Sequence, residues 1–215
     1  MGIPNTTSVT IANRALQLVG YQTISSLTEN SRGAKAMNRA YYPVLWSELR
    51  KNYWNFAISR AQLPAAAQGP SFGKTYYYPL PPDFLDLAPP DQIYGVQGGG
   101  TIAGNQILAG TPIITGSPIL DWQIEGNQIA TNQQGPLNIR YVSMNVTESM
   151  FDPCFSEAFA AALACDTCEE LTQSNTKLAA LKQIYQETID EAMKRNAFEG
   201  RPIQPPTDTY IISRF

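Results

Sequence analysis

A long segment rich in glycine, proline, asparagine and glutamine interrupts the helical periodicity of this chain and restricts it to a mixed fold. From about residue 70 to residue 146, short apolar runs alternate with these turn-forming residues. Gly104-Asn105 and Gly126-Asn127 stand between such runs and predict hairpin turns, which require a positive φ angle. The middle of the chain is therefore predicted to be a small antiparallel β barrel or sandwich.

Six segments have the length and the residue types of strands. They span residues 75–78, 92–96, 106–109, 119–124, 128–131 and 137–143. Just before the first of them, Gly69 to Lys74 has the composition of a phosphate-binding loop, but three residues separate its glycines where the Walker A motif has four. Because this stretch leads into a predicted strand and not into a helix, we interpret it as a turn.

Helical periodicity precedes this middle segment. Apolar residues recur at helical spacing after Ser8, which can cap a helix that Gly20 ends, and again over residues 31–51. Pro43 lies inside the second pattern and is expected to kink or divide it, because proline lacks the amide donor and clashes with the preceding turn. The aromatic residues of this region are interpreted as mostly core: Tyr41, Tyr42, Trp46, Tyr53, Trp54 and Phe56.

Helical patterns return after the middle segment. Asp152 and Pro153 form a helix opening, with the acid as N-cap, and Ser174 can start a second helix that ends before Gly200. The predicted α+β organisation is a helical domain of about four helices at residues 1–69 and 148–200, an inserted antiparallel β barrel or sandwich module at residues 70–147, and an extended, proline-containing C-terminal tail at residues 201–215.

The chain contains no histidine, and this absence excludes several kinds of site. Histidine is the general base of most serine and cysteine triads and the commonest zinc ligand, so triads and metal sites that depend on it are impossible here. The three cysteines, Cys154, Cys165 and Cys168, lie in one predicted helical region and are interpreted as small buried residues. Because enzymes without histidine exist, this absence makes catalysis less expected without excluding it; we expect no cofactor and no metal.

The N-terminal residues lack the basic and apolar regions of a signal peptide. No stretch approaches the roughly 18 uninterrupted apolar residues of a membrane span. Together with the cysteine pattern, these features predict a protein that is made in a reducing cytoplasm and stays soluble.

Basic residues concentrate toward the N-terminus. Residues 1–75 hold eight basic and two acidic side chains, whereas the remaining residues hold seven basic and sixteen acidic ones. Arg32, Lys35 and Arg39 follow helical spacing and share one face of the second predicted helix. Two interpretations are open for them: a basic stripe that faces DNA or an acidic partner, and an ordinary solvated helix face.

Five stretches carry a recognisable pattern: residues 15–20 (ALQLVG), 24–27 (ISSL), 31–42, 54–63 (WNFAISRAQL) and 77–85 (YYPLPPDFL). Together they resemble the tail tubular protein A family, the head-to-tail adaptors or gatekeepers of short-tailed phages. Residues 54–63 are the most specific part of this resemblance, and the C-terminal helices fit by pattern only.

The resemblance implies a structural virion protein without catalysis, assembled in the host cytoplasm and located in the tail or neck of the virion. Adaptors of this family form a homo-oligomeric, dodecameric ring beneath the portal protein and continue the DNA channel. They seat the tail nozzle protein, which is similar to tail tubular protein B, and often tail fibres. We expect the helical domain to meet the portal and the β module to face the nozzle or a fibre.

On this resemblance, Arg32, Lys35 and Arg39 contact the portal or, transiently and without sequence specificity, the channel DNA. The tail is expected to become ordered only against a neighbouring copy or the portal, and its docking residues are Arg201, Tyr210, Ile211, Ile212, Arg214 and Phe215. Two other functions stay open: a tail-associated cell-wall glycosidase, and a glycan-binding or fibre-anchoring module centred on residues 70–147.

Overall fold

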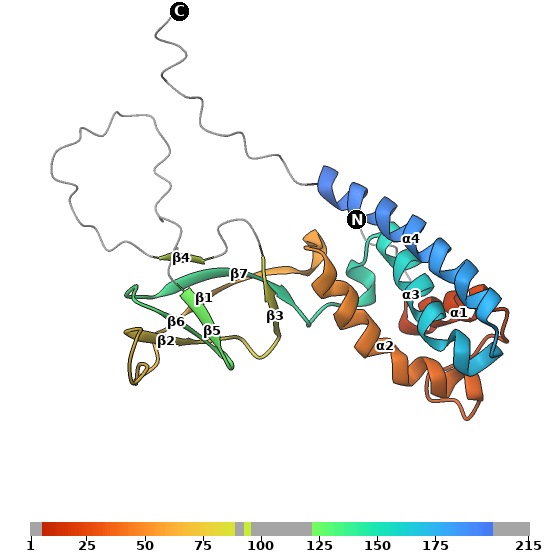
Figure 1. The fold of residues 1–215 in the computed structure, drawn as a ribbon, viewed down its shortest axis with the longest axis horizontal. Helices are drawn as coiled ribbons and strands as arrows, with labels where there is room; N and C mark the ends of the chain where they lie inside the picture. Colours follow the sequence, from red (N-terminus) through yellow and green to blue (C-terminus); the bar gives the residue numbers. More distant parts are fainter. Residues whose placement is uncertain (1–5, 89–92, 96–121, 200–215) are drawn as a thin grey trace, which may run out of the picture.

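The computed structural model describes residues 6–88, 93–95 and 122–199, which form two parts that follow one another along the long axis of the molecule (Figure 1). Helices from both sides of the chain form one part, and strands from its middle form the other. The predicted α+β fold is therefore confirmed, with strands inserted between helices α2 and α3. The strand expected at 106–109, the turn at Gly104-Asn105 and the tail at 201–215 lie outside the described residues.

The helical part contains, within the described residues, α1 (Ser8–Val19), α2 (Arg32–Lys51), α3 (Pro153–Thr172) and α4 (Asn175–Phe198). The predicted caps at Asp152 and Ser174 are confirmed, because both side chains accept hydrogen bonds from backbone N–H groups of the first helical turn. Helix α1 is capped by Thr7 and not by Ser8. Thr7 forms a reciprocal capping box with Thr10, which satisfies two free N–H groups together.

Helix α2 runs through Pro43 without a break, so the expected division at this proline does not occur. Met37, before the proline, and Leu45, after it, are both buried in the same hydrophobic core. This burial keeps both halves helical, and it outweighs the single backbone hydrogen bond that proline removes.

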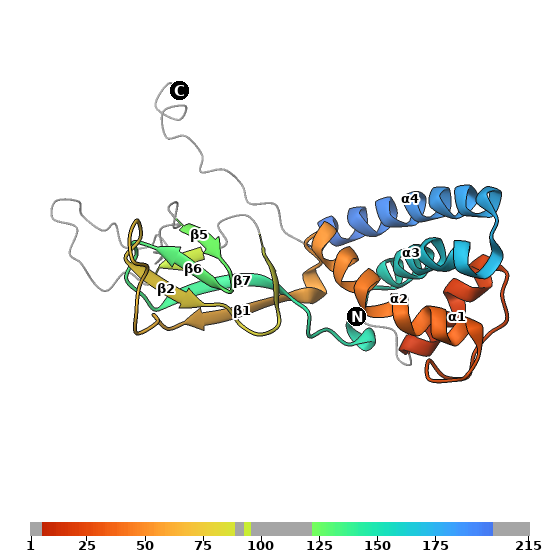
Figure 2. The same ribbon diagram turned by 60° about the horizontal axis from the view of Figure 1, so that its bottom comes forward.

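Helix α3 is the central helix of this part. It packs against α1, α2 and α4, and Figure 2 shows it between α4 and the other two. Alanines cover much of its surface and are buried, which lets three helices approach it closely: Ala158, Ala160, Ala161, Ala162 and Ala164. At its first turn, Phe155 contacts the rings of Trp54, Phe56 and Phe151 at centroid distances of 4.7, 4.9 and 5.1 Å. These aromatic contacts tie α3 to the segments that enter and leave the strands.

Strand β7 is the centre of the first antiparallel sheet. Its members are β1 (Ile58–Leu63), β3 (Phe84–Leu87), β4 (Ile93–Gly95) and β7 (Leu137–Ser143). Strand β1 follows nearly the whole of β7, with Ile58 opposite Val142 and Leu63 opposite Leu137. Strands β3 and β4 pair with different parts of β7 and therefore share its other edge.

The second sheet has the order β2–β6–β5, with β2 (Tyr76–Pro79), β5 (Trp122–Glu125) and β6 (Gln128–Thr131). The predicted hairpin at Gly126-Asn127 is confirmed, and Gly126 has the positive φ angle of 60° that such a turn requires. Tyr78 and Ile129 of this sheet share one apolar core with Leu137 of the first sheet. Because the described strands pair only within their own sheets, the module is a small sandwich and not a closed barrel.

Two strands differ from the sequence prediction. Strand β1 lies within residues 1–69, which were assigned to the helical domain, and β3 has no counterpart among the six predicted segments. Only Leu63 of β1 is fully buried, so the local pattern carries little signal. Strand β1 is instead defined by its antiparallel hydrogen bonding with β7, a pairing between segments far apart in the sequence. The sheet therefore begins before the boundary expected at residue 70.

Candidate functional site

The three basic residues singled out in the sequence lie exposed on α2. Arg32 donates a hydrogen bond to the main-chain carbonyl of Glu170, and Arg39 forms an ion pair with the Glu170 carboxylate at an N···O distance of 2.5 Å. Glu170 lies near the C-terminal end of α3, where the partial negative charge of the helix also favours cations. The structure thus brings Arg32 and Arg39 to one acidic residue, and Lys35 is exposed to solvent.

The same face of α2 continues with two aromatic residues and a fourth basic one. Tyr42, Trp46 and Arg50 extend the spacing of three to four residues that begins at Arg32. Tyr42 is 54% and Trp46 40% exposed, and their ring centroids lie 5.8 Å apart. We call the following side chains the α2 stripe: Arg32, Lys35, Arg39, Tyr42, Trp46 and Arg50.

The interpretation of the nearby aromatic residues as mostly core holds for only part of them. Tyr41 and Trp54 are buried, whereas Tyr42, Trp46 and Tyr53 are exposed. The aromatic half of the stripe is therefore absent from the contact residues predicted from the sequence. The spacing from Arg32 to Arg50 contains the signal that could have found it, since both aromatics fall on the face already assigned to basic residues.

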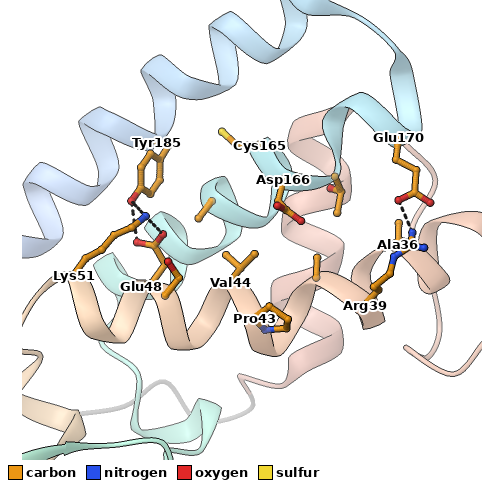
Figure 3. A pocket seen from close by; sticks show the side chains of 14 residues that line it. Ala36, Arg39, Pro43, Val44, Glu48, Lys51, Cys165, Asp166, Glu170 and Tyr185 are labelled. Atoms are coloured by element: carbon orange, nitrogen blue, oxygen red, sulfur yellow. Dashed lines mark hydrogen bonds and ion pairs between the residues drawn. The ribbon is translucent and has the colours of Figure 1, made fainter. Parts of the chain in front are cut away.

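A groove of about 610 Å³ lies on another side of α2, between this helix, α3 and Tyr185 of α4 (Figure 3). Its apolar lining consists of small residues, among them Ala36, Ala40, Val44, Ala162 and Cys165. Polar links mark its two ends: Arg39 with Glu170 at one, and Glu48 with Lys51 and Tyr185 at the other (Figure 3). The groove thus has charged residues at both ends, and Ser47, Asp166 and Thr167 interrupt its apolar lining.

Glu48 is the buried member of the second link, with a side chain only 3% exposed. Its carboxylate accepts hydrogen bonds from Lys51 Nζ at 2.6 Å and from the Tyr185 hydroxyl at 2.9 Å. Burial lowers the pKa of Lys51, but its hydrogen bonds to Glu48 and Tyr185 raise that pKa above the ordinary value. Burial raises the pKa of Tyr185. At neutral pH, Lys51 is held charged and Tyr185 neutral, and their hydrogen bonds to Glu48 join α2 to α4.

Alkaline pH is expected to destabilise the fold, because several tyrosines ionise less readily in the folded chain than in the unfolded one. Burial raises the pKa of Tyr41, and the Glu148 carboxylate raises it further. Burial likewise raises the pKa of Tyr141 and of Tyr185. Stability from a raised pKa is complete below the ordinary tyrosine value of about 10 and is lost as pH rises through the folded-state value.

Denaturant unfolding at pH values between about 8 and 11 measures this effect, and we expect the free energy of unfolding to fall as pH rises. The free energy of unfolding of a Tyr41→Phe variant should fall less steeply with pH, because phenylalanine cannot ionise. The matched control is Tyr42→Phe, which removes a hydroxyl from the exposed neighbouring residue. Equal slopes for Tyr41→Phe and the original protein would contradict the role given to Tyr41.

The cysteines occupy positions that favour packing over thiolate chemistry. Cys168 is buried, and Cys154 and Cys165 are half-buried. Burial raises the pKa of both half-buried thiols, which disfavours the thiolate form that redox and metal chemistry requires. Within the described ranges, no group of three or more cysteine, aspartate and glutamate residues is arranged to hold a metal ion. No described helix combines the length and the apolar character that crossing a bilayer requires.

The α2 stripe has the composition of a candidate binding face. Tryptophan, tyrosine and arginine are the residues most enriched where protein interfaces bind tightly, and the α2 stripe presents all three. The residues predicted to dock the tail lie outside the described part of the chain: Arg201, Tyr210, Ile211, Ile212, Arg214 and Phe215. No protein-family model and no curated protein matches the chain.

Proposed function

We propose that the protein is a structural component of a phage virion, a head-to-tail adaptor that forms a ring between the portal protein and the tail nozzle protein. The observation that carries this proposal is the place of residues 54–63, the stretch that resembles the adaptor family most specifically. Trp54 is buried in the helical core, and Ile58–Leu63 forms strand β1. The resembling stretch is therefore the junction between the two parts of the molecule.

The two-part shape also supports an adaptor. The β module extends from the helical part along the long axis of the molecule (Figures 1 and 2). An adaptor needs one contact surface toward the portal and a different one toward the nozzle, and an elongated chain with helices at one end and strands at the other provides two such surfaces. In the proposed orientation the helical part meets the portal, and the β module meets the nozzle or a tail fibre.

Mixing the purified protein with the portal ring of its own phage tests this function. Electron microscopy is expected to show a second ring, stacked coaxially on the portal with a defined copy number. If the two proteins stay separate at concentrations where other virion proteins assemble, the adaptor function is wrong.

Removing residues 201–215 tests the proposed docking of the tail. Portal binding is expected to weaken by about tenfold or more, because losing contacts that contribute about 1.4 kcal/mol is enough for that change. Thermal unfolding of the truncated chain is the control, and it should match that of the full chain. Unchanged portal affinity would contradict tail docking while leaving the adaptor function standing.

A further inference from the structure

On the four described α-helices, the large apolar side chains that are most exposed lie on α2 and α4 only. Helix α2 exposes Tyr42 and Trp46, and helix α4 exposes Ile184 and Phe198. Single exposed apolar residues are common on protein surfaces, but here each of the two helices exposes a pair of them.

Helix α4 carries a stripe of its own. Ile184, Glu187 and Glu191 are exposed at helical spacing, Ala180 precedes them on the same face, and Phe198 follows near the helix end. Phe198 is 86% exposed. We call these five residues the α4 stripe. Its central segment is apolar and acidic, whereas Lys194 and Arg195, at helical spacing between Glu191 and Phe198, make its C-terminal end basic.

The centres of the two stripes are complementary in charge. The α2 stripe combines two aromatic residues with four basic ones, whereas the α4 stripe centres on Ile184 beside Glu187 and Glu191. Both repeat at steps of three and four residues, the spacing with which two helices pack side by side. Packing the stripes together would cover the exposed apolar residues and place arginine and lysine against glutamate.

Within one chain the two stripes face apart. Helices α2 and α4 flank α3 in both ribbon views (Figures 1 and 2), and each turns its buried side toward the shared core. The groove of Figure 3 is lined by Val44 and Lys51 of α2 and by Tyr185 of α4, and it includes neither Trp46 nor Ile184. Apart from Arg39, which lies at one end of this groove, the residues of the two stripes do not line it, so packing the stripes together requires another molecule.

We propose that the α2 stripe of one copy packs against the α4 stripe of a neighbouring copy. Such an interface joins two different surfaces and so repeats head to tail, which closes into a ring when the rotation between copies allows it. The inference rests on the proposed adaptor function for the closed ring, and it assigns the basic residues of α2 to a neighbouring copy in place of channel DNA. Glu170 already neutralises part of their charge, which favours a protein partner over DNA.

Charge reversal on each stripe separately provides the test. One variant carries Lys35→Glu, which leaves the Arg39–Glu170 and Arg50–Asp86 pairs intact, and the other carries Glu187→Lys and Glu191→Lys. Each variant alone is expected to self-associate at least about tenfold more weakly in sedimentation velocity, because like charges then meet. An equal mixture of the two variants is expected to associate again, since each reversed stripe meets a reversed partner.

A matched control reverses exposed charges away from both stripes, with Arg60→Glu on β1 and Glu125→Lys on β5, and should leave association unchanged. Trp46→Ala tests the apolar half of the contact without changing charge, and it should also weaken association. If the separate variants associate normally, or if their mixture does not recover association, the proposed interface is wrong. It is also wrong if the α2 variant loses only salt-sensitive binding to duplex DNA.

The same variants separate this inference from the adaptor function. Portal rings that take up the original protein and both variants at equal copy number would overturn the interface and leave the adaptor. Portal rings that bind nothing, while association in solution follows the predicted pattern, would overturn the adaptor and leave the interface. An original protein that stays monomeric both alone and with the portal would overturn both.

Discussion

A Phe155→Ala variant is expected to lose about 3 to 5 kcal/mol of stability, the largest effect we expect from a single substitution in the helical part. Phe155 is completely buried, and its ring meets those of Trp54, Phe56 and Phe151. Truncation would leave a cavity among rigid rings that cannot easily collapse into it. For a chain of this length, the loss corresponds to a melting temperature about 6 to 20 °C lower.

Thermal unfolding followed by circular dichroism measures this loss through the helical signal. Phe155→Leu is the matched control, because it keeps most of the apolar volume and should cost about 1 kcal/mol. If Phe155→Ala melts within a few degrees of the original protein, the aromatic cluster does not hold α3 as the structure indicates.

A Tyr78→Ala variant is expected to cost about 3 to 5 kcal/mol in the β module. Tyr78 is completely buried, its hydroxyl donates to the carbonyl of Gln133 at 2.9 Å, and its ring lies against the backbone of Gly135. The β core and the helical core contain different residues. Hydrogen exchange should therefore quicken first in β2 and β6, while α3 and α4 stay protected.

The control for the tyrosine is Tyr78→Phe, which keeps the ring and removes one hydrogen bond, at an expected cost of about 1 kcal/mol. Exchange mapped residue by residue distinguishes a local effect from a global one. Equal loss of protection in α3 and in β6 would show that the two cores unfold as one unit.

Helix boundaries were the most predictable part of the fold, because their signals are local. Asp152 and Ser174 cap helices through bonds to residues two or three positions away, and Gly20 ends α1 in the left-handed conformation that favours glycine. The hairpin at Gly126-Asn127 has the same local character. In each case the contacts that form the cap or turn join residues only a few positions apart, so the local sequence contains the whole signal.

Strand β1 and the groove depend on distant residues, and the sequence could not predict them. Ile58 finds its partner at Val142, and Glu48 finds one at Tyr185, through contacts that exist only after folding. Glu48 does leave a faint signal, since it is an acid at an otherwise apolar position of its helix. For the basic stripe, the shared face of Arg32, Lys35 and Arg39 was predictable. The involvement of two of them with α3 was not.

The pairing of β1 with β7 determines which bonds resist a force that pulls the β module away from the helical part. Ala57, just before β1, and Val142, near the end of β7, are both anchored in the helical core. Both connections to the β module therefore leave the helices at the same end of one antiparallel pair. A pull that separates the two parts stretches two covalent chains in parallel and does not slide one strand past the other. Two chain segments therefore connect the parts, and covalent backbone bonds resist such a pull, not the hydrogen bonds between β1 and β7.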